Sequence, residues 1–554
     1  MSDVASASAD GVTVAQAGDS LLAARDKALT EAARDDVAAA LVGRDPTLWG
    51  PEATAEATIR LGWLDCTRLS RPLVPEIEAL RAELRAAGVD RVVLAGMGGS
   101  SLAPEVITST YGVALTVLDT TDPGQVAAAM TQDIERTVLV VSSKSGGTVE
   151  TDSHRRAFER AFRDAGIDPA ERIVVVTDPD SPLERTARES SYRVFRADPN
   201  VGGRYSALTA FGLVPAGLAG VPIGELLDQA AALEPSLGDT DNPALALGAA
   251  LGGFGRSGHD KLVIADAGSG IVGFGDSAPL TNAFGAWAEQ LVAESTGKNG
   301  RGLLPVVVEG TDAPGFVESA DNHLLVLGTT PPTTGTAVSG PLGAQFLLWE
   351  YATAVAGRVL QINPFDQPNV QESKDNTKAV LEKAGDGPLP EGDPVFVDGA
   401  VEVHAVNPAL LDGAGDLRAA LSALLGAVPE RGYLAVMAYL DRQRDADAGR
   451  LRAILAARTA HAVTFGWAPR FLHSTGQFHK GGPPVGTFLQ VTGAHEADLE
   501  VPGQPFTFGR LQLAQALGDL QALESRQRPV LRLHLTDRVA GLRQLLDAAA
   551  GAPV

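Results

Sequence analysis

The stretch RTVLVVSSKSGGTVET, residues 136–151, decides the fold because it joins a buried strand to a turn rich in small hydrogen-bond donors. Its opening run of branched apolar residues is typical of a strand buried on both faces of a parallel sheet. Four hydroxyl side chains, one lysine and two glycines follow. Because glycine turns expose backbone N–H groups and a helix N-terminus attracts negative charge, this turn predicts a site for a phosphate monoester.

The same strand–turn–helix pattern recurs along the chain and predicts an α/β fold with two doubly wound parallel sheets. Its apolar runs are RVVLAG (91–96), ALTVLD (114–119), RIVVVTD (172–178) and YRVFRA (192–197), then DKLVIADA (260–267), GLLPVVVEG (302–310), HLLVLGT (323–329) and RVLQINPF (358–365).

Four segments are expected from these patterns. Residues 1–85 read as a disordered start followed by helices, 86–240 as the first doubly wound domain and 241–395 as the second. Residues 396–554 mix helices and strands and form a C-terminal α/β region. The proline- and glycine-rich EKAGDGPLPEGDP (382–394) is the expected linker into that region.

Composition narrows the classes of function. The 554 residues suffice for two or three packed domains. A net charge of −23 argues against a nucleic-acid partner. Cys66 is the only cysteine, so an intramolecular disulfide and a cysteine-based metal site are both excluded. Since no secretory leader and no membrane-length apolar run is present, we expect a cytoplasmic protein with no membrane partner.

A second glycine-rich turn, LAGMGGSSLAPE (94–105), follows another predicted strand. For a single turn of this kind, helix capping by Ser and Thr is as good an explanation as ligand binding. Two such turns in successive strand-to-helix units favour ligand binding, since ligands of open α/β sheets bind beyond the carboxyl ends of strands. Nucleotide binding fits poorly, because GMGGSS lacks the third glycine of the dinucleotide motif and no GxxxxGK[ST] occurs.

Three further motifs place single charged residues in unusual settings. Glu294 ends a helical run in WAEQLVAESTGKNGRGLLP (287–305), where the helix dipole disfavours a carboxylate. Arg204 opens an apolar helix in VGGRYSALTAFGLVPAGLAG (201–220) and needs a counter-anion from protein or ligand. Lys374 follows a proline turn in INPFDQPNVQESKDN (362–376). Solvated charges remain the alternative for Glu294 and Lys374.

Together these motifs resemble glucose-6-phosphate isomerase, a family of the sugar isomerase (SIS) superfamily. The resemblance extends over about residues 90–380 and implies two SIS domains. TAVAGRVLQINPFDQPNVQESKDNT (353–377) and PRFLHSTGQFHKGGP (469–483) look most like the isomerase half of bacterial transaldolase–isomerase fusions. Too few residues precede Arg91 for a transaldolase half, so only the isomerase part is expected.

The resemblance implies an aldose–ketose isomerase of glycolysis and gluconeogenesis that needs no cofactor and no metal. It implies that Glu294 moves a proton between C2 and C1, that Arg204 stabilises the enediolate and that Lys374 helps to open the sugar ring. These roles agree with the chemistry, which needs one carboxylate over both carbons and a fixed cation beside the developing oxyanion. The implied substrate-binding residues are Gly99, Ser100, Ser143, Lys144, Ser145, Thr148, Gln290 and Gln367. A homodimer is a family expectation.

One departure from the family pattern concerns the histidine that assists ring opening from a neighbouring subunit. The corresponding segment GPLGAQFLLWEYATA (340–354) holds Gln345 and Glu350 but no histidine. His473 and His479 are the expected replacements, with Glu350 a weaker candidate. Three alternatives stay open: a non-catalytic SIS protein that binds a sugar phosphate and regulates a partner, a degenerate isomerase, and an isomerase that also accepts mannose 6-phosphate.

Overall fold

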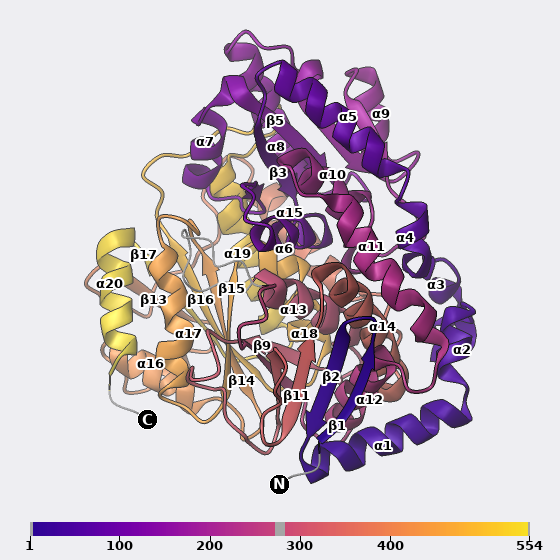
Figure 1. Ribbon diagram of the computed structural model, residues 1–554. Helices are drawn as coiled ribbons and strands as arrows, with labels where there is room; N and C mark the ends of the chain where they lie inside the picture. Colours follow the sequence, from indigo (N-terminus) through magenta and orange to yellow (C-terminus); the bar gives the residue numbers. More distant parts are fainter. Residues whose placement is uncertain (1–3, 272–282, 552–554) are drawn as a thin grey trace.

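The computed structural model describes residues 4–271 and 283–551 and builds them around three β-sheets with helices between and outside them (Figure 1). Two of the sheets are the doubly wound parallel sheets predicted from the sequence. The third lies in the C-terminal region. Among the described residues, no helix combines the length and the apolar composition that a membrane span requires.

The first sheet is entirely parallel, with strand order β4-β3-β5-β6-β7. All six residues of its central strand β5 are buried, as the continuous apolar run predicts. Its strands are β3 (Arg91–Gly96), β4 (Thr116–Leu118), β5 (Thr137–Ser142), β6 (Ile173–Thr177) and β7 (Arg193–Arg196). The helices that alternate with them are α6 (Leu102–Thr110), α7 (Pro123–Thr131), α8 (Val149–Asp164) and α9 (Pro182–Glu189).

The second sheet has the order β1-β2-β11-β10-β8-β9. Four of its strands are parallel: β8 (Lys261–Asp266), β9 (Leu304–Val307), β10 (Asn322–Leu327) and β11 (Gly335–Ser339). The expectation of a disordered start is wrong, because β1 (Val4–Ala9) and β2 (Val12–Ala17) form an antiparallel hairpin that adds to β11. Asp10 and Gly11 both have positive φ, which is the geometry that an Asp-Gly hairpin turn favours.

The expected strand RVLQINPF is also wrong, since its first three residues end helix α14 (Leu342–Leu360). All residues of α14 except Arg358 are buried. A helix buried on every side lacks an amphipathic period, so its apolar sequence cannot be told from that of a buried strand.

The third sheet has the order β12-β13-β17-β16-β14-β15, with the last four strands parallel. Helices α16 (Leu417–Gly426), α17 (Leu451–Ala456) and α20 (Arg538–Ala549) pack on one face. Helices α18 (Gly476–Gly481) and α19 (Phe508–Glu524) cover the other. The strands are β12 (Phe396–Asp398), β13 (Val401–Ala405), β14 (Tyr433–Tyr439), β15 (Ala462–Trp467), β16 (Gly486–Gly493) and β17 (Val530–Leu535).

The remaining helices join the sheets into one body. Helix α12 packs along α14, and α15 packs along α19, so the C-terminal region packs directly against the part of the chain that carries the second sheet (Figure 1). These helices are α1 (Asp19–Arg34), α2 (Val37–Val42), α3 (Thr54–Thr58), α4 (Cys66–Leu69), α5 (Leu73–Ala86), α10 (Ala210–Ala219), α11 (Ile223–Leu233), α12 (Pro243–Arg256), α13 (Ala283–Thr296) and α15 (Val370–Ala384).

Candidate active site

Two short turns meet beyond the carboxyl end of β3, and their backbones touch. The 3₁₀ turn Gly98–Ser100 follows β3, and the 3₁₀ turn Gly203–Tyr205 lies against it. A Cβ atom on Gly99 would lie 1.9 Å from the carbonyl oxygen of Gly203, so only glycine permits this approach. The contact places Arg204 beside the predicted sugar-binding turn, in which Ser100 is buried.

Arg204 is 3% exposed and is held by polar groups from two segments, α13 and the loop that follows α14. Its Nε donates to Ser295 Oγ at 2.7 Å, and its Nη1 donates to Gln367 Oε1 at 2.9 Å. Its Nη2 donates to the carbonyl oxygens of Pro364 at 2.7 Å and Asp366 at 3.0 Å. A guanidinium fixed in this way is a preorganised cation, which is what stabilisation of an oxyanion requires.

Lys298 is a second buried cation, and it binds the same loop at residues 363–367. It is 1% exposed, and its Nζ donates to the carbonyl oxygen of Asn363 at 2.8 Å and to the carboxylate of Asp366 at 2.6 Å. Burial lowers the pKa of Lys298 to about 8, and the positive charge of Arg204 adds to the effect. Two cations thus hold one loop, and that loop carries Gln367 into the site.

Glu294 lies directly against the Arg204 cation. Its Oε1 is 3.3 Å from Arg204 Nη1, and its Oε2 accepts a hydrogen bond of 3.0 Å from Gln290 Nε2. Gln290 also donates to the backbone carbonyl of His473 at 2.7 Å. The structure therefore brings together Arg204, Glu294, Gln290 and Gln367, which the sequence had placed in three separate motifs.

The predicted phosphate turn connects β5 to α8. Ser143 Oγ lies 3.2 Å from Thr148 Oγ1 and accepts from the backbone N–H of Gly146, while Ser145 Oγ accepts from that of Gly147. The side chain of Lys144 is engaged by another residue, because its Nζ forms an ion pair of 2.6 Å with Asp178. The turn thus offers hydroxyl groups and a helix N-terminus to an anion, whereas the charge of Lys144 is already paired.

A cleft of about 730 Å³ opens beside this turn. Ser145, Thr148, Lys374 and His473 all line it, although they come from three distant parts of the chain. A cavity of this size is within the range of small-molecule sites. Arg204 and Glu294 do not themselves line this cleft. Gln290 connects the pair to the cleft wall, because it donates to both Glu294 and the backbone carbonyl of His473.

His473 has a carboxylate partner that the sequence reasoning missed. Its Nε2 lies 3.0 Å from Oε1 of the buried Glu150, which also accepts a hydrogen bond of 2.7 Å from Gln515 Nε2. Although burial raises the pKa of Glu150, its contact with His473 more than offsets the rise and brings this pKa to about 2. Glu150 stands in the quoted stretch two residues after Thr148, whereas nothing in the sequence pointed to Gln515 on α19.

The structure does not bring His479 to the cleft, which corrects its expected catalytic role. Its imidazole is 3% exposed, stacks on Tyr433 and shares a 2.9 Å hydrogen bond at Nδ1 with the tyrosine hydroxyl. Burial lowers the pKa of His479 to about 3, so it stays neutral. It lies on α18 and packs against Tyr433 and Phe488 of the third sheet as an aromatic core residue.

Glu350 is likewise remote from the cleft surface. It lies on α14 with its side chain fully buried, and burial raises its pKa well above the ordinary value. Neither carboxylate oxygen has a hydrogen-bond partner among the described residues. Because Glu350 does not line the cleft, His473 is the remaining candidate for the expected ring-opening role.

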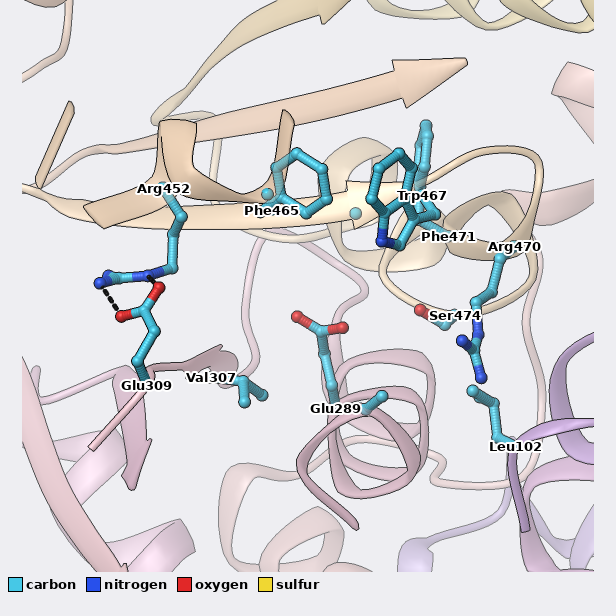
Figure 2. A pocket seen from close by; sticks show the side chains of 13 residues that line it. Leu102, Glu289, Val307, Glu309, Arg452, Phe465, Trp467, Arg470, Phe471 and Ser474 are labelled. Atoms are coloured by element: carbon cyan, nitrogen blue, oxygen red, sulfur yellow. Dashed lines mark hydrogen bonds and ion pairs between the residues drawn. The ribbon is translucent and has the colours of Figure 1, made fainter. Parts of the chain in front are cut away.

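A second, smaller cavity of about 70 Å³ lies on the far side of α13, where Glu289 faces Trp467, Arg470 and Ser474 (Figure 2). Its enclosed surroundings raise the pKa of Glu289 to about 8, although the Arg470 guanidinium opposes the rise. Arg470 is itself paired with Glu105 and Asp119. Glu289 thus carries a proton at neutral pH and has no place in the cleft.

We expect the variant Glu289→Gln to reveal this protonation through thermal stability. The pKa of Glu289 is raised on folding, so the protonated side chain favours the folded state. Its contribution to the free energy of unfolding is fully present below pH 4.5 and is lost as the pH rises toward 8. The variant should melt like the native protein at pH 5 and about 2 °C or more higher at pH 8.5. Melting curves at both pH values measure this, and an equal difference at the two would contradict it.

Comparisons with known proteins agree with this geometry. Residues 82–243 match the family model described as phosphoglucose isomerase. A probable glucose-6-phosphate isomerase of Haloarcula marismortui is 36% identical over 227 residues, 40% of this chain and 49% of that protein. The glucose-6-phosphate isomerase of Cyanothece sp. is 32% identical over 42% of this chain and 45% of that protein. A probable glucose-6-phosphate isomerase of Methanococcus maripaludis is 29% identical over 51% of this chain and 77% of that protein.

The chain thus spans about half the length of the first two of these relatives. Two solved structures share the fold. A hypothetical protein of Thermus thermophilus has a TM-score of 0.56 at 21% identity and covers 68% of this chain and all of its own. A glucose-6-phosphate isomerase of Chlamydia trachomatis has a TM-score of 0.52 at 19% identity and covers 68% of this chain and 90% of its own. Residues 82–243 are therefore similar to the glucose-6-phosphate isomerase family.

Proposed function

We propose that the protein interconverts glucose 6-phosphate and fructose 6-phosphate through a cis-enediol intermediate. The observation that carries this proposal is the contact of Glu294 with the fixed Arg204 guanidinium at 3.3 Å, next to a cleft that begins at a phosphate-type turn. A protein that only binds a sugar phosphate needs the turn but not this acid–base pair. The proposal includes work in the cytoplasm, at a step of glycolysis and gluconeogenesis.

In this proposal the cleft orients the substrate by its phosphate. Thr148 and Ser145 donate hydroxyl groups, and the N-terminus of α8 adds backbone N–H groups and its dipole. Phosphate binding remote from the reacting carbons then positions C1 and C2. With its charge paired to Asp178, Lys144 shapes this turn more than it binds the phosphate.

Glu294 then acts as the base. It takes the proton from C2 of the open-chain aldose and returns it to C1, while the negative charge that develops on the oxygens lies beside Arg204. Gln290 holds the other carboxylate oxygen, so the base keeps one orientation through both transfers. Arg204 keeps its positive charge throughout, because a guanidinium does not lose its proton in proteins.

Ring opening is assigned to His473, with Lys374 on the same cleft wall. Opening breaks the bond between C1 and the ring oxygen, which gains a proton while the C1 hydroxyl loses one. Since Nε2 of His473 faces Glu150, Nδ1 is left for the substrate. The histidine comes from the C-terminal region of the same chain, which fills the place of the family's neighbouring-subunit histidine.

His473 lies within PRFLHSTGQFHKGGP, so we also propose the isomerase half of transaldolase–isomerase fusions as the nearest subtype. Homodimer formation stays a prediction. The cleft as described favours no hexose over another, and turnover of mannose 6-phosphate by the native protein would identify a dual phosphoglucose/phosphomannose isomerase.

We expect Glu294→Gln to lower kcat for fructose 6-phosphate about 10³-fold, within the usual range for removal of a general base. Binding of the sugar phosphate, measured by calorimetry, should change little because the phosphate turn is untouched. Glu289→Gln, on the same helix, is the matched control and should keep native kcat. If the Glu294→Gln variant kept more than a tenth of native activity, Glu294 could not be the base.

We expect His473→Ala to separate ring opening from proton transfer. Exchange between the α and β anomers of glucose 6-phosphate, followed by NMR magnetisation transfer, reports ring opening alone. His473→Ala should slow enzyme-catalysed anomer exchange about 10-fold or more, whereas Glu294→Gln should leave it intact. Native anomer exchange in the histidine variant would assign ring opening to another group, and native protein that binds without turnover would favour the non-catalytic alternative.

A further inference from the structure

The C-terminal sheet has a topological switch point of its own. Strand β14 lies in the middle, and the chain leaves it toward β15 on one side. From β16, on the other side of β14, the chain continues in the opposite direction to β17. In open α/β sheets a ligand crevice forms where two such connections diverge, beyond the carboxyl ends of the strands.

A cavity of about 340 Å³ lies at this crevice. Its floor is formed by the strand ends, at Tyr439 of β14 and Thr492 and Gly493 of β16. Gln512 and Leu513 of α19 form one wall, and Leu389 of the loop after α15 contributes to another. Nothing in the isomerase proposal uses these residues.

Two buried polar groups that line this cavity have no partner within the described part of the chain. Tyr439 is 1% exposed, and its hydroxyl makes no hydrogen bond. Gln512 is 2% exposed, and its Nε2 makes none either. Because burying an unpaired polar group costs free energy, the pair points to a ligand that completes their hydrogen bonds.

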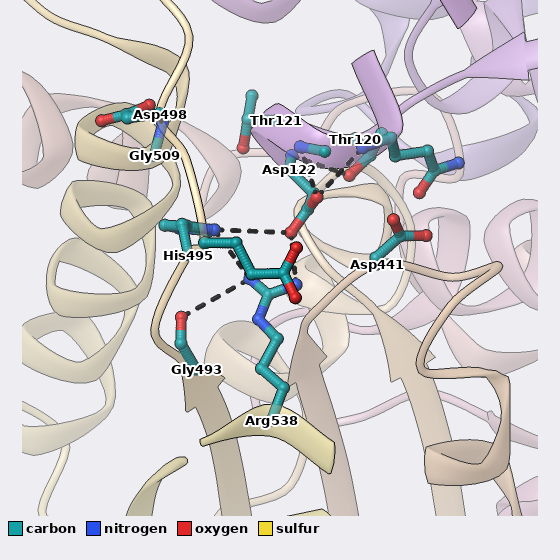
Figure 3. Close-up of polar contacts among 12 residues, drawn as sticks. Thr120, Thr121, Asp122, Asp441, Gly493, His495, Asp498, Gly509 and Arg538 are labelled. Carbon is teal, nitrogen blue, oxygen red and sulfur yellow. Dashed lines mark hydrogen bonds and ion pairs between the residues drawn. The ribbon is translucent and has the colours of Figure 1, made fainter. Parts of the chain in front are cut away.

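The charged groups at the cavity are already paired. Outside its rim, Arg538 Nη1 contacts Asp122 at 2.8 Å and Asp445 at 3.2 Å, and its Nη2 lies 2.8 Å from Nδ1 of His495 (Figure 3). Asp498 accepts hydrogen bonds from two backbone N–H groups and from a threonine hydroxyl. Arg510 donates to the carbonyl oxygens of residues 385 and 387, and Glu391 faces Arg532.

Among the described residues, the groups left for a ligand are a tyrosine hydroxyl and an amide NH₂, both uncharged. His495 and His534 also line the cavity, with Nδ1 of each already hydrogen-bonded. Opposite them lies an aliphatic wall of Pro388, Leu389 and Leu513. The flat face of a heterocyclic base can pack on this aliphatic wall, and the hydroxyl groups of a ribose can complete the hydrogen bonds of the tyrosine hydroxyl and the amide. We propose that this crevice is a second ligand site, for a nucleoside without a phosphate group.

The site is tested on the full-length protein by calorimetry with adenosine and uridine, in the presence of saturating fructose 6-phosphate so that the cleft is filled. We expect saturable binding of a nucleoside that Tyr439→Phe weakens about 5-fold, the usual effect of one lost hydrogen bond. Tyr433→Phe is the matched control, because Tyr433 lies on the same strand with its hydroxyl bonded to His479. It should leave nucleoside binding unchanged.

A second readout needs no ligand. Since the Tyr439 hydroxyl is unpartnered within the described residues, Tyr439→Phe should melt at or above the native temperature, whereas Tyr433→Phe should melt lower. Equal destabilisation by the two variants would overturn the proposal. So would the absence of nucleoside binding at millimolar concentration, binding of adenosine monophosphate but not adenosine, or binding of free monosaccharides alone. Isomerase activity is a separate measurement, so failure here leaves the proposed reaction untouched.

Discussion

The buried charge of Arg204 is the constraint on which the rest of the site depends. A guanidinium taken out of water is costly unless every side of it meets an acceptor. Here the acceptors come from α13 and from the loop at residues 363–367, which lie far apart in sequence. Arg204 therefore finds its acceptors only where α13 and this loop pack against the turn at residues 203–205.

Much of the fold could be predicted because its strands are buried on both faces, which leaves continuous apolar runs such as residues 137–142. The same reasoning failed where burial is complete for a helix, as in α14. It also failed at the N-terminus, where the alternation of β1 and the Asp10–Gly11 turn are weak signals until β11 offers an edge. The local sequence shows the hydrophobic periodicity of a helix or strand, whereas the segment that packs against it and stabilises it lies elsewhere in the chain.

The site shows the same division. Glycine turns and misplaced charges marked Gly99, Arg204 and Glu294, because each violates a local preference that only function or close packing explains. Glu150 was missed because a carboxylate in the first turn of a helix satisfies the dipole and attracts no notice. His473 and His479 could not be separated by sequence, since they stand in one short motif. Three-dimensional packing places one beside Glu150 and the other among aromatic rings.

Helix α19 links the C-terminal sheet to the cleft beside the phosphate-type turn. Gln515 on one face of the helix donates to Glu150 and so fixes the partner of His473. Gln512, one turn earlier, faces the crevice of the third sheet. One helix thus supplies both the hydrogen bond to the partner of His473 and a wall of the crevice. The C-terminal region thus forms part of the wall of the cleft.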